Sequence, residues 1–145
     1  MGKRVIVVGG GIAGMQTALK LSAGGVSALL LERDADLGGK LTGWHKLFPS
    51  FTPAHEVLDE LRRRLAASDV EVRTRCEVAE VARDGVMLST GERLEADAVV
   101  VATGFTLFDA RIKEEYGYGI YDNVYTTVDI ERMLNDCLLY TSPSP

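Results

Sequence analysis

The sequence has few of the residues that build metal centres and disulfides. Its 145 residues include two cysteines, Cys76 and Cys137, and two histidines, His45 and His55. The cysteines form no C-x-x-C pair, and the histidines lack the spacing of metal ligands. We therefore expect no metal site and no redox-active disulfide. Free thiols are typical of reducing compartments, so a cytoplasmic location is expected.

Long apolar runs and clusters of positive charge are also lacking. No apolar stretch approaches the roughly 20 residues that cross a membrane, so no membrane span is expected. The net charge is −5, and the densest basic run, residues 62–64, falls within an amphipathic helical pattern. Nucleic acid is therefore not expected as a partner. The apolar run at residues 5–8 ends in three glycines, unlike the core of a signal peptide.

What is present is the composition of a globular protein. Apolar residues make up 46% of the chain and charged residues 26%, which is ordinary for a packed domain. The length suffices for one domain with a substantial core. It is short for a protein with separate cofactor and substrate domains.

Three glycines stand between an expected strand at residues 5–8 and an expected helix at residues 12–23. Gly9, Gly11 and Gly14 follow the G-x-G-x-x-G pattern. The first glycine permits a tight turn, the second lets the backbone approach a pyrophosphate, and the third lets helix and strand pack closely. The N–H groups at the start of the helix then face the phosphates. The pattern predicts a dinucleotide-binding turn.

An acid closes the second expected strand, at residues 26–31. Glu32 lies eighteen residues after Gly14, where dinucleotide-binding folds place the acid that binds the adenosine ribose. Its charge would repel a 2′-phosphate, which disfavours NADP. A solvated acid at a strand end is the alternative. The adjacent Arg33 either covers the adenosine or lies on the surface.

A glycine doublet, Gly38-Gly39, follows this acid. A generic NAD-binding unit does not require it. The doublet offers a second close approach of backbone to an extended cofactor, and Lys40 offers a positive charge to the pyrophosphate. A plain loop is the alternative.

The middle of the chain predicts a helix preceded by packed aromatic residues. Thr52 is a capping-type residue and Pro53 suits the first helical position, so a helix is expected to begin there and to end near residue 67. Trp44, Phe48 and Phe51 are expected to pack beneath a loop rather than to contact a ligand.

Short strand patterns then lead to a longer apolar strand. An antiparallel meander is expected over residues 76–94, with a hairpin turn at Asp84-Gly85. Residues 98–102 predict a fully buried strand that ends at Thr103-Gly104, at the sheet edge where α/β folds bind ligands. The predicted fold class is therefore α/β: a Rossmann-like parallel sheet with an inserted antiparallel β-meander.

These features together resemble the two-dinucleotide-binding-domain flavoproteins. The glycine turn with Glu32, the Gly38-Gly39 doublet, the meander and the Ala102-Thr103-Gly104 strand end occur in the order of that family, over roughly residues 3–105. In that family this domain binds FAD. The resemblance therefore implies an FAD-dependent oxidoreductase.

The resemblance also implies which residues hold the cofactor. The glycine turn would hold the pyrophosphate, the acid and the arginine after it the adenosine end, and the doublet and strand end the flavin side. The implied residues are Gly9, Gly11, Ile12, Ala13, Gly14, Glu32, Arg33, Gly38, Gly39, Lys40, Val78, Ala102, Thr103 and Gly104. No side chain is identified as a catalytic acid, base or nucleophile.

A finer resemblance lies in residues 10–16 and 113–124, which are similar to the flavin subunit of heterodisulfide reductase. Such subunits pass electrons between flavin and iron–sulfur centres, so iron–sulfur partner subunits are implied. The cysteine-rich segments that ligate clusters in that family are absent from this sequence. An iron–sulfur centre within this chain is therefore not expected.

The end of the chain differs in character. A helix is expected at residues 126–134, with Thr126 and Asp129 forming a capping box. Residues 137–145 are similar to translated sequencing-adapter read-through. We therefore expect a partial FAD-binding domain at residues 1–134 and a non-native or disordered tail at residues 135–145. The NAD(P)H-binding domain and the late Gly-Asp segment of the family would then be missing from this chain.

Two other functions are compatible with the sequence. One is an NAD-binding module of a dehydrogenase, against which the glycine doublet and the meander argue. The other is a non-catalytic flavin scaffold within an electron-transfer complex.

Overall fold

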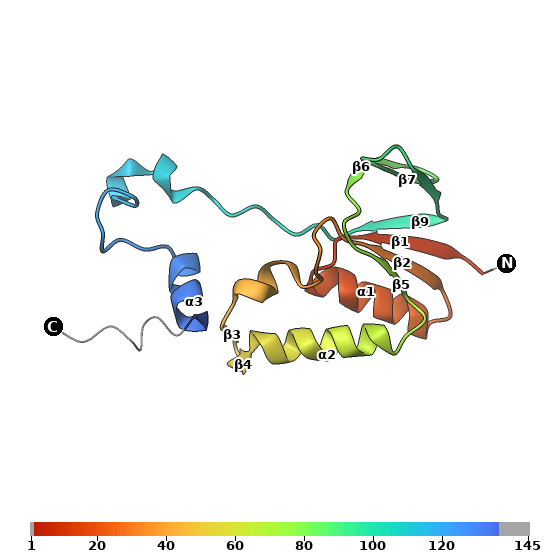
Figure 1. Cartoon of the computed structure of the whole chain (residues 1–145), viewed down its shortest axis with the longest axis horizontal. Helices are drawn as coiled ribbons and strands as arrows, with labels where there is room; N and C mark the ends of the chain where they lie inside the picture. The colour runs from red at the N-terminus through yellow and green to blue at the C-terminus, as the bar shows by residue number, and fades with distance from the viewer. Residues whose placement is uncertain (1, 137–145) are drawn as a thin grey trace.

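The computed structural model describes residues 2–136 as an α/β fold built on one parallel sheet (Figure 1). The sheet contains β1 (Arg4–Val8), β2 (Ser27–Leu31), β5 (Glu71–Arg73) and β9 (Ala98–Val101), in the order β5-β2-β1-β9. All of these pairings are parallel, and Val8 lies opposite Leu31 on one side and Val101 on the other. The predicted fold class is confirmed. The predicted tail lies outside the described residues from position 137 onward.

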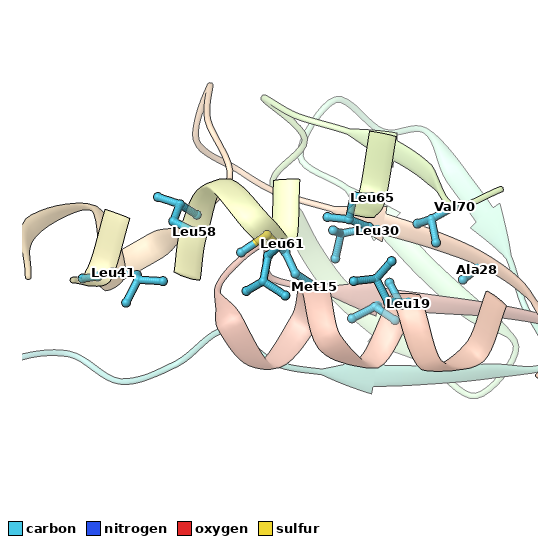
Figure 2. Packing of buried hydrophobic residues seen from close by; sticks show 12 residues of the cluster. Met15, Leu19, Ala28, Leu30, Leu41, Leu58, Leu61, Leu65 and Val70 are labelled. Carbon is cyan, nitrogen blue, oxygen red and sulfur yellow. The ribbon is translucent and has the colours of Figure 1, made fainter. Parts of the chain in front are cut away.

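Two helices cover one face of this sheet. They are α1 (Ile12–Ala23), as predicted, and α2 (Ala54–Ala66). Both helices present apolar side chains at helical spacing toward the sheet, so one core lies between the two layers (Figure 2). Its buried members include Val7, Met15, Leu19, Leu30, Leu58, Leu61 and Leu65.

The antiparallel meander covers the opposite face (Figure 1). It consists of β6 (Val78–Ala82), β7 (Gly85–Leu88) and β8 (Arg93–Glu95), paired in sequence order as predicted. A second core lies between the meander and the sheet: Ile6, Val8, Leu29, Leu31, Val86, Leu88 and Leu94. Because successive side chains of a strand alternate between its faces, β1 and β2 contribute to both cores. This explains why their sequences are apolar throughout.

The start of α2 differs from the prediction. Thr52 and Pro53 form a short strand, β4 (Thr52–Pro53), which pairs with β3 (Lys46–Leu47), and the helix begins at Ala54. Thr52 does not cap the helix. The Ala54 N–H instead donates to the carbonyl of His45 at 2.9 Å. The local capping pattern is overridden by a hairpin whose other strand lies upstream.

The prediction for the aromatic residues is correct only for Trp44, which packs against the first core. Phe48 is 86% exposed and Phe51 66% exposed. Their rings meet edge to face on the hairpin, with centroids 6.4 Å apart. The turn between β3 and β4 carries both side chains away from the core.

Strand β9 is an edge strand, not the fully buried strand that was predicted. Among the described residues it pairs only with β1, and Val101 is 61% exposed. Val99 and Val100 are partly buried and pack on the two opposite cores. The apolar sequence correctly indicates two covered faces. Full burial also requires a neighbouring strand on each side, which the sequence of one strand does not reveal.

Beyond β9 the chain leaves the sheet as an extended arm and returns as α3 (Thr127–Asn135) (Figure 1). The arm contains two short 3₁₀ helices, η2 (Ala110–Ile112) and η3 (Glu114–Tyr116). α3 begins at the predicted capping box and contacts another 3₁₀ helix, η1 (Gly39–Gly43). Within residues 2–136, no helix combines the length and hydropathy that a membrane span requires.

The turn between β1 and α1 has no room for side chains at two of its glycines. Gly9 has a φ of +109°, and a Cβ at this position would lie 2.4 Å from the carbonyl oxygen of Ala102. A Cβ at Gly14 would lie 1.8 Å from the carbonyl oxygen of Gly9. Both distances are shorter than any tolerated contact. The packing of α1 against the end of β1 therefore requires glycine at position 14, and the approach of residue 102 to the turn requires it at position 9.

We therefore predict that Gly14→Ala destabilises the fold. Inserting a methyl group into a packed site costs about 1–3 kcal/mol and occasionally more, which exceeds the gain of about 0.5–1 kcal/mol in helix propensity. Urea unfolding measures the difference. Gly11→Ala is the matched control, because a Cβ at Gly11 meets nothing within 4 Å. Equal stability of the two variants would contradict the packing role of Gly14.

Candidate functional site

A cavity of about 440 Å³ opens at the carboxyl edge of the parallel sheet, where β1, β2 and β9 end. Its volume is in the range of small-molecule sites. Of the fourteen residues proposed from sequence, thirteen line it: Gly9, Gly11, Ile12, Ala13, Glu32, Arg33, Gly38, Gly39, Lys40, Val78, Ala102, Thr103 and Gly104. Gly14 lies beneath the turn, against Gly9. Five separate segments of the chain therefore converge on one cavity.

The glycine turn forms the floor of the cavity. Gly11 is the N-cap residue of α1, with φ −75° and ψ −174°, and the space in the direction of its absent Cβ is open. Ile12 and Ala13 begin the helix here and also line the cavity. The first N–H groups of a helix have no partner within it and carry its positive dipole end. This arrangement suits an anion such as a pyrophosphate.

Glu32 is buried, at 7% exposure, and its orientation is held by the backbone. Its Oε2 accepts a hydrogen bond from the Gly10 N–H at 2.5 Å, and its Oε1 accepts one from the Asp34 N–H at 2.9 Å. Each carboxylate oxygen can accept a further hydrogen bond. Glu32 therefore stabilises the glycine turn and still has acceptor capacity for a hydroxyl group in the cavity. The alternative of a solvated acid at a strand end is wrong.

The arginine beside it is less constrained. The Arg33 side chain is exposed and forms a surface ion pair with Asp34, with Nε 3.9 Å from Oδ1. Such pairs contribute little to stability. Arg33 lies at the cavity and on the surface at once, so the structure is compatible with both of its predicted roles.

The glycine doublet forms a second wall of the cavity and packs against the glycine turn. The Gly38 N–H donates to the Gly10 carbonyl at 2.8 Å, and a Cβ at Gly39 would lie 3.4 Å from the Cα of Gly11. Both doublet residues have positive φ, +134° and +53°. The Nζ of Lys40 lies 4.8 Å from the centroid of the Phe105 ring, a cation–π contact across the cavity. Both doublet residues line the cavity, and their contact with a cofactor stays a prediction.

The remaining walls come from the strand end and from the meander. The Ala102 N–H donates to the Val8 carbonyl at 2.7 Å, which holds residues 102–104 beside the glycine turn. Gly104 has a φ of +76°, where the chain turns into the arm. Val78, at the start of β6, reaches the cavity from the other side of the sheet.

Several lining residues were not proposed from the sequence. Trp44, Phe105, Cys76 and Glu77 all contribute to the cavity. Trp44 was assigned only to packing, although it serves both purposes. Cys76 is brought to the site by its N–H, which donates to the Glu32 carbonyl at 2.8 Å. Its position depends on where β2 and the segment after β5 meet, which no local motif encodes.

The described part of the chain contains no group of three or more His, Cys, Asp and Glu side chains that could hold a metal ion. The cavity lining includes backbone N–H groups, one buried carboxylate, one lysine and two aromatic side chains. Groups of this kind suit an extended anionic ligand.

Comparisons with known proteins agree with this geometry. The sequence profile of the pyridine nucleotide-disulphide oxidoreductase family matches residues 3–113 and 45–131, in two overlapping segments. An iron–sulfur subunit of CoB–CoM heterodisulfide reductase from Methanocaldococcus jannaschii is 54% identical over 43 residues. The corresponding iron–sulfur subunit from Methanopyrus kandleri is 58% identical over 43 residues. Each match covers 30% of this chain and only 6% of the relative.

Solved structures share the fold. A 2-methyl-3-hydroxypyridine-5-carboxylic acid oxygenase superposes with a TM-score of 0.60 at 22% identity, over 72% of this chain and 40% of that protein. A ferredoxin reductase from Rhodopseudomonas palustris superposes with a TM-score of 0.51 at 22% identity, over 79% of this chain and 27% of the reductase. At these identities the comparison establishes the architecture.

The position of Glu32 predicts a stability effect that needs no ligand. Glu32→Ala removes the acceptor of the buried Gly10 N–H, and an unpaired buried donor costs about 1–3 kcal/mol. Urea unfolding of the variant should show a loss of this size. Glu77→Ala, which removes an exposed acid from the same cavity, should leave stability nearly unchanged. A similar effect of both substitutions would contradict the structural role of Glu32.

Proposed function

The chain belongs to the pyridine nucleotide-disulphide oxidoreductase family, and from that premise we propose that it is the FAD-binding part of an electron-transfer oxidoreductase resembling the flavin subunit of heterodisulfide reductase. The predicted class, an FAD-dependent oxidoreductase, agrees with this family and with the heterodisulfide reductase matches. The matched segments are short relative to those proteins. The activity of the whole protein is therefore part of the proposal.

The observation that carries the proposal is the open space at Gly11. Gly9 and Gly11 both line the cavity, but only at Gly11, at the positive end of α1, is the space of the absent Cβ open, whereas a Cβ at Gly9 or Gly14 would meet backbone atoms. A pyrophosphate needs this unobstructed backbone and these free N–H groups. We assign it to Gly9, Gly11, Ile12 and Ala13, with Gly14 setting the distance of the helix.

The two ends of the cavity suit the two ends of FAD. Glu32 has free acceptor capacity for the ribose hydroxyls of adenosine. Arg33 follows it directly, and the Cys76 N–H, which donates to the Glu32 carbonyl, holds the segment before Val78 beside it. The opposite end would hold the flavin side, between the doublet wall with its lysine and the strand end: Gly38, Gly39, Lys40, Ala102, Thr103 and Gly104.

When bound, FAD supplies the redox chemistry of such a site. The residues of this chain bind and orient it. Lys40 places a positive charge beside the doublet, near the expected path of the phosphates. Trp44 and Phe105 add aromatic surface to the cavity lining. No described side chain is assigned to proton transfer.

Iron–sulfur partner proteins are also part of this proposal. The two relatives reported above are both named as iron–sulfur subunits of heterodisulfide reductases. Iron–sulfur partner proteins would then accept or donate electrons, and the NAD(P)H-binding part would lie outside this chain. A cytoplasmic location is included in the proposal.

We predict that the purified chain binds FAD in preference to NAD. Trp44 is the only tryptophan of the chain and lines the cavity, so bound flavin should quench its fluorescence. Titration with FAD should give a saturable quench, and NAD should compete at least about tenfold more weakly. Tighter binding of NAD than of FAD would favour the NAD-binding module instead. Turnover with iron–sulfur partners would exclude the non-catalytic scaffold.

A second prediction concerns the open space at Gly11. Gly11→Ala places a methyl group where the pyrophosphate would lie, so FAD affinity should fall about tenfold or more, or at least about 1.4 kcal/mol. The fold should remain intact, as urea unfolding would verify. Gly24→Ala is the matched control: this residue caps the other end of α1, a Cβ there would come no closer than 3.4 Å to the carbonyl oxygens of Lys20 and Leu21, and it does not line the cavity. Unchanged affinity in Gly11→Ala would remove the assigned role of the turn.

A further inference from the structure

One wall of the cavity is fixed at its far end by two helices. This wall segment, residues 39–45, includes η1, Trp44 and His45. The His45 carbonyl accepts from the N–H of Ala54, the first residue of α2, at 2.9 Å. The His45 N–H donates to Oε2 of Glu131, on α3, at 2.7 Å. A single residue thus links the wall to both α2 and α3 through its backbone.

The near end of the wall is held by the glycine turn, through the hydrogen bond from the Gly38 N–H to the Gly10 carbonyl. Lys40, Leu41 and Trp44 lie between these two anchors, and all three line the cavity. Trp44 immediately precedes His45. Its ring position therefore depends on where the His45 backbone is held.

The contact from α3 joins residues that are 86 positions apart in sequence. The intervening arm extends away from the sheet before α3 returns beside η1 (Figure 1). No residue of α3 is fully buried, and its apolar side chains are half-buried. The Glu131 carboxylate adds a directed hydrogen bond that joins this helix to the cavity wall.

The first turn of α3 is stabilised by hydrogen bonds between its own residues. The Thr126 hydroxyl and the Asp129 carboxylate form a reciprocal capping box. The hydrogen bonds from the Thr126 side chain and backbone hold the pKa of Asp129 below its ordinary value, so the carboxylate stays ionised and the box stays intact. Glu131 follows two residues later, in a turn whose backbone this box has already set.

We propose that Glu131 is a positioning residue for the cofactor cavity: by holding the His45 N–H, it fixes the wall that carries Lys40, Leu41 and Trp44. A charged acceptor makes a stronger hydrogen bond to a backbone N–H than a neutral group does. The consequence for cofactor affinity rests on the proposed FAD function, whereas the position of the wall does not.

The experiment compares Glu131→Ala, Glu131→Gln and Arg132→Ala with the unaltered chain. Glu131→Gln keeps an oxygen that can accept from the His45 N–H, and Arg132 is an exposed residue of the same helix. Because Trp44 is the only tryptophan, acrylamide quenching of its fluorescence without cofactor reports on the wall directly. FAD titration then measures the cofactor site, and urea unfolding verifies that each variant is folded.

We expect Glu131→Ala to make Trp44 more accessible to acrylamide and to weaken FAD binding at least about fivefold, the lower end of typical coupling between sites. Glu131→Gln should show a smaller effect than Glu131→Ala, because its neutral oxygen still accepts but makes a weaker hydrogen bond, and Arg132→Ala should resemble the unaltered chain. Unchanged quenching in Glu131→Ala, or equal damage from Glu131→Gln, would overturn the positioning role. If no form binds FAD while Trp44 still responds to Glu131→Ala, the proposed function fails and the positioning role stands.

Discussion

The site depends on the close approach of α1 to the end of β1. The carbonyl of Gly9 occupies the space that a side chain at Gly14 would need, and the carbonyl of Ala102 occupies the space that a side chain at Gly9 would need. These contacts bring the start of a helix, the end of β1 and the exit of β9 together. Every other wall of the cavity is placed relative to this turn.

Within that arrangement, the groups suited to ligand binding also hold the protein together. Glu32 accepts two backbone hydrogen bonds before any ligand arrives, one of them from the glycine turn. Gly38 donates back to the same turn. The cavity is therefore organised by its own polar contacts, which lowers the ordering cost of binding an extended dinucleotide.

The region after β9 is organised differently. Its large apolar side chains are mostly exposed, among them Phe105, Phe108, Ile112, Tyr116 and Tyr121. The described arm meets the wall segment through polar and cation–π contacts: Lys40 with Phe105 at one end, and Glu131 with the His45 N–H at the other. The two ends of the region after β9 therefore both contact the same segment of the cavity wall, residues 39–45.

The sequence by itself determined the α/β class, the glycine turn and the meander. It also identified residues of the cavity lining: of the fourteen residues proposed for the site, all but Gly14 line the cavity. These features follow from local rules: side-chain periodicity, the backbone freedom of glycine, and fixed spacing along a βαβ unit. Only the tertiary structure decided the start of α2, the edge position of β9, the exposure of Phe48 and Phe51, and the contributions of Cys76 and Glu131. Each of these depends on which distant segment lies alongside, because strand burial and long-range hydrogen bonds are properties of neighbours in space and not of neighbours in sequence.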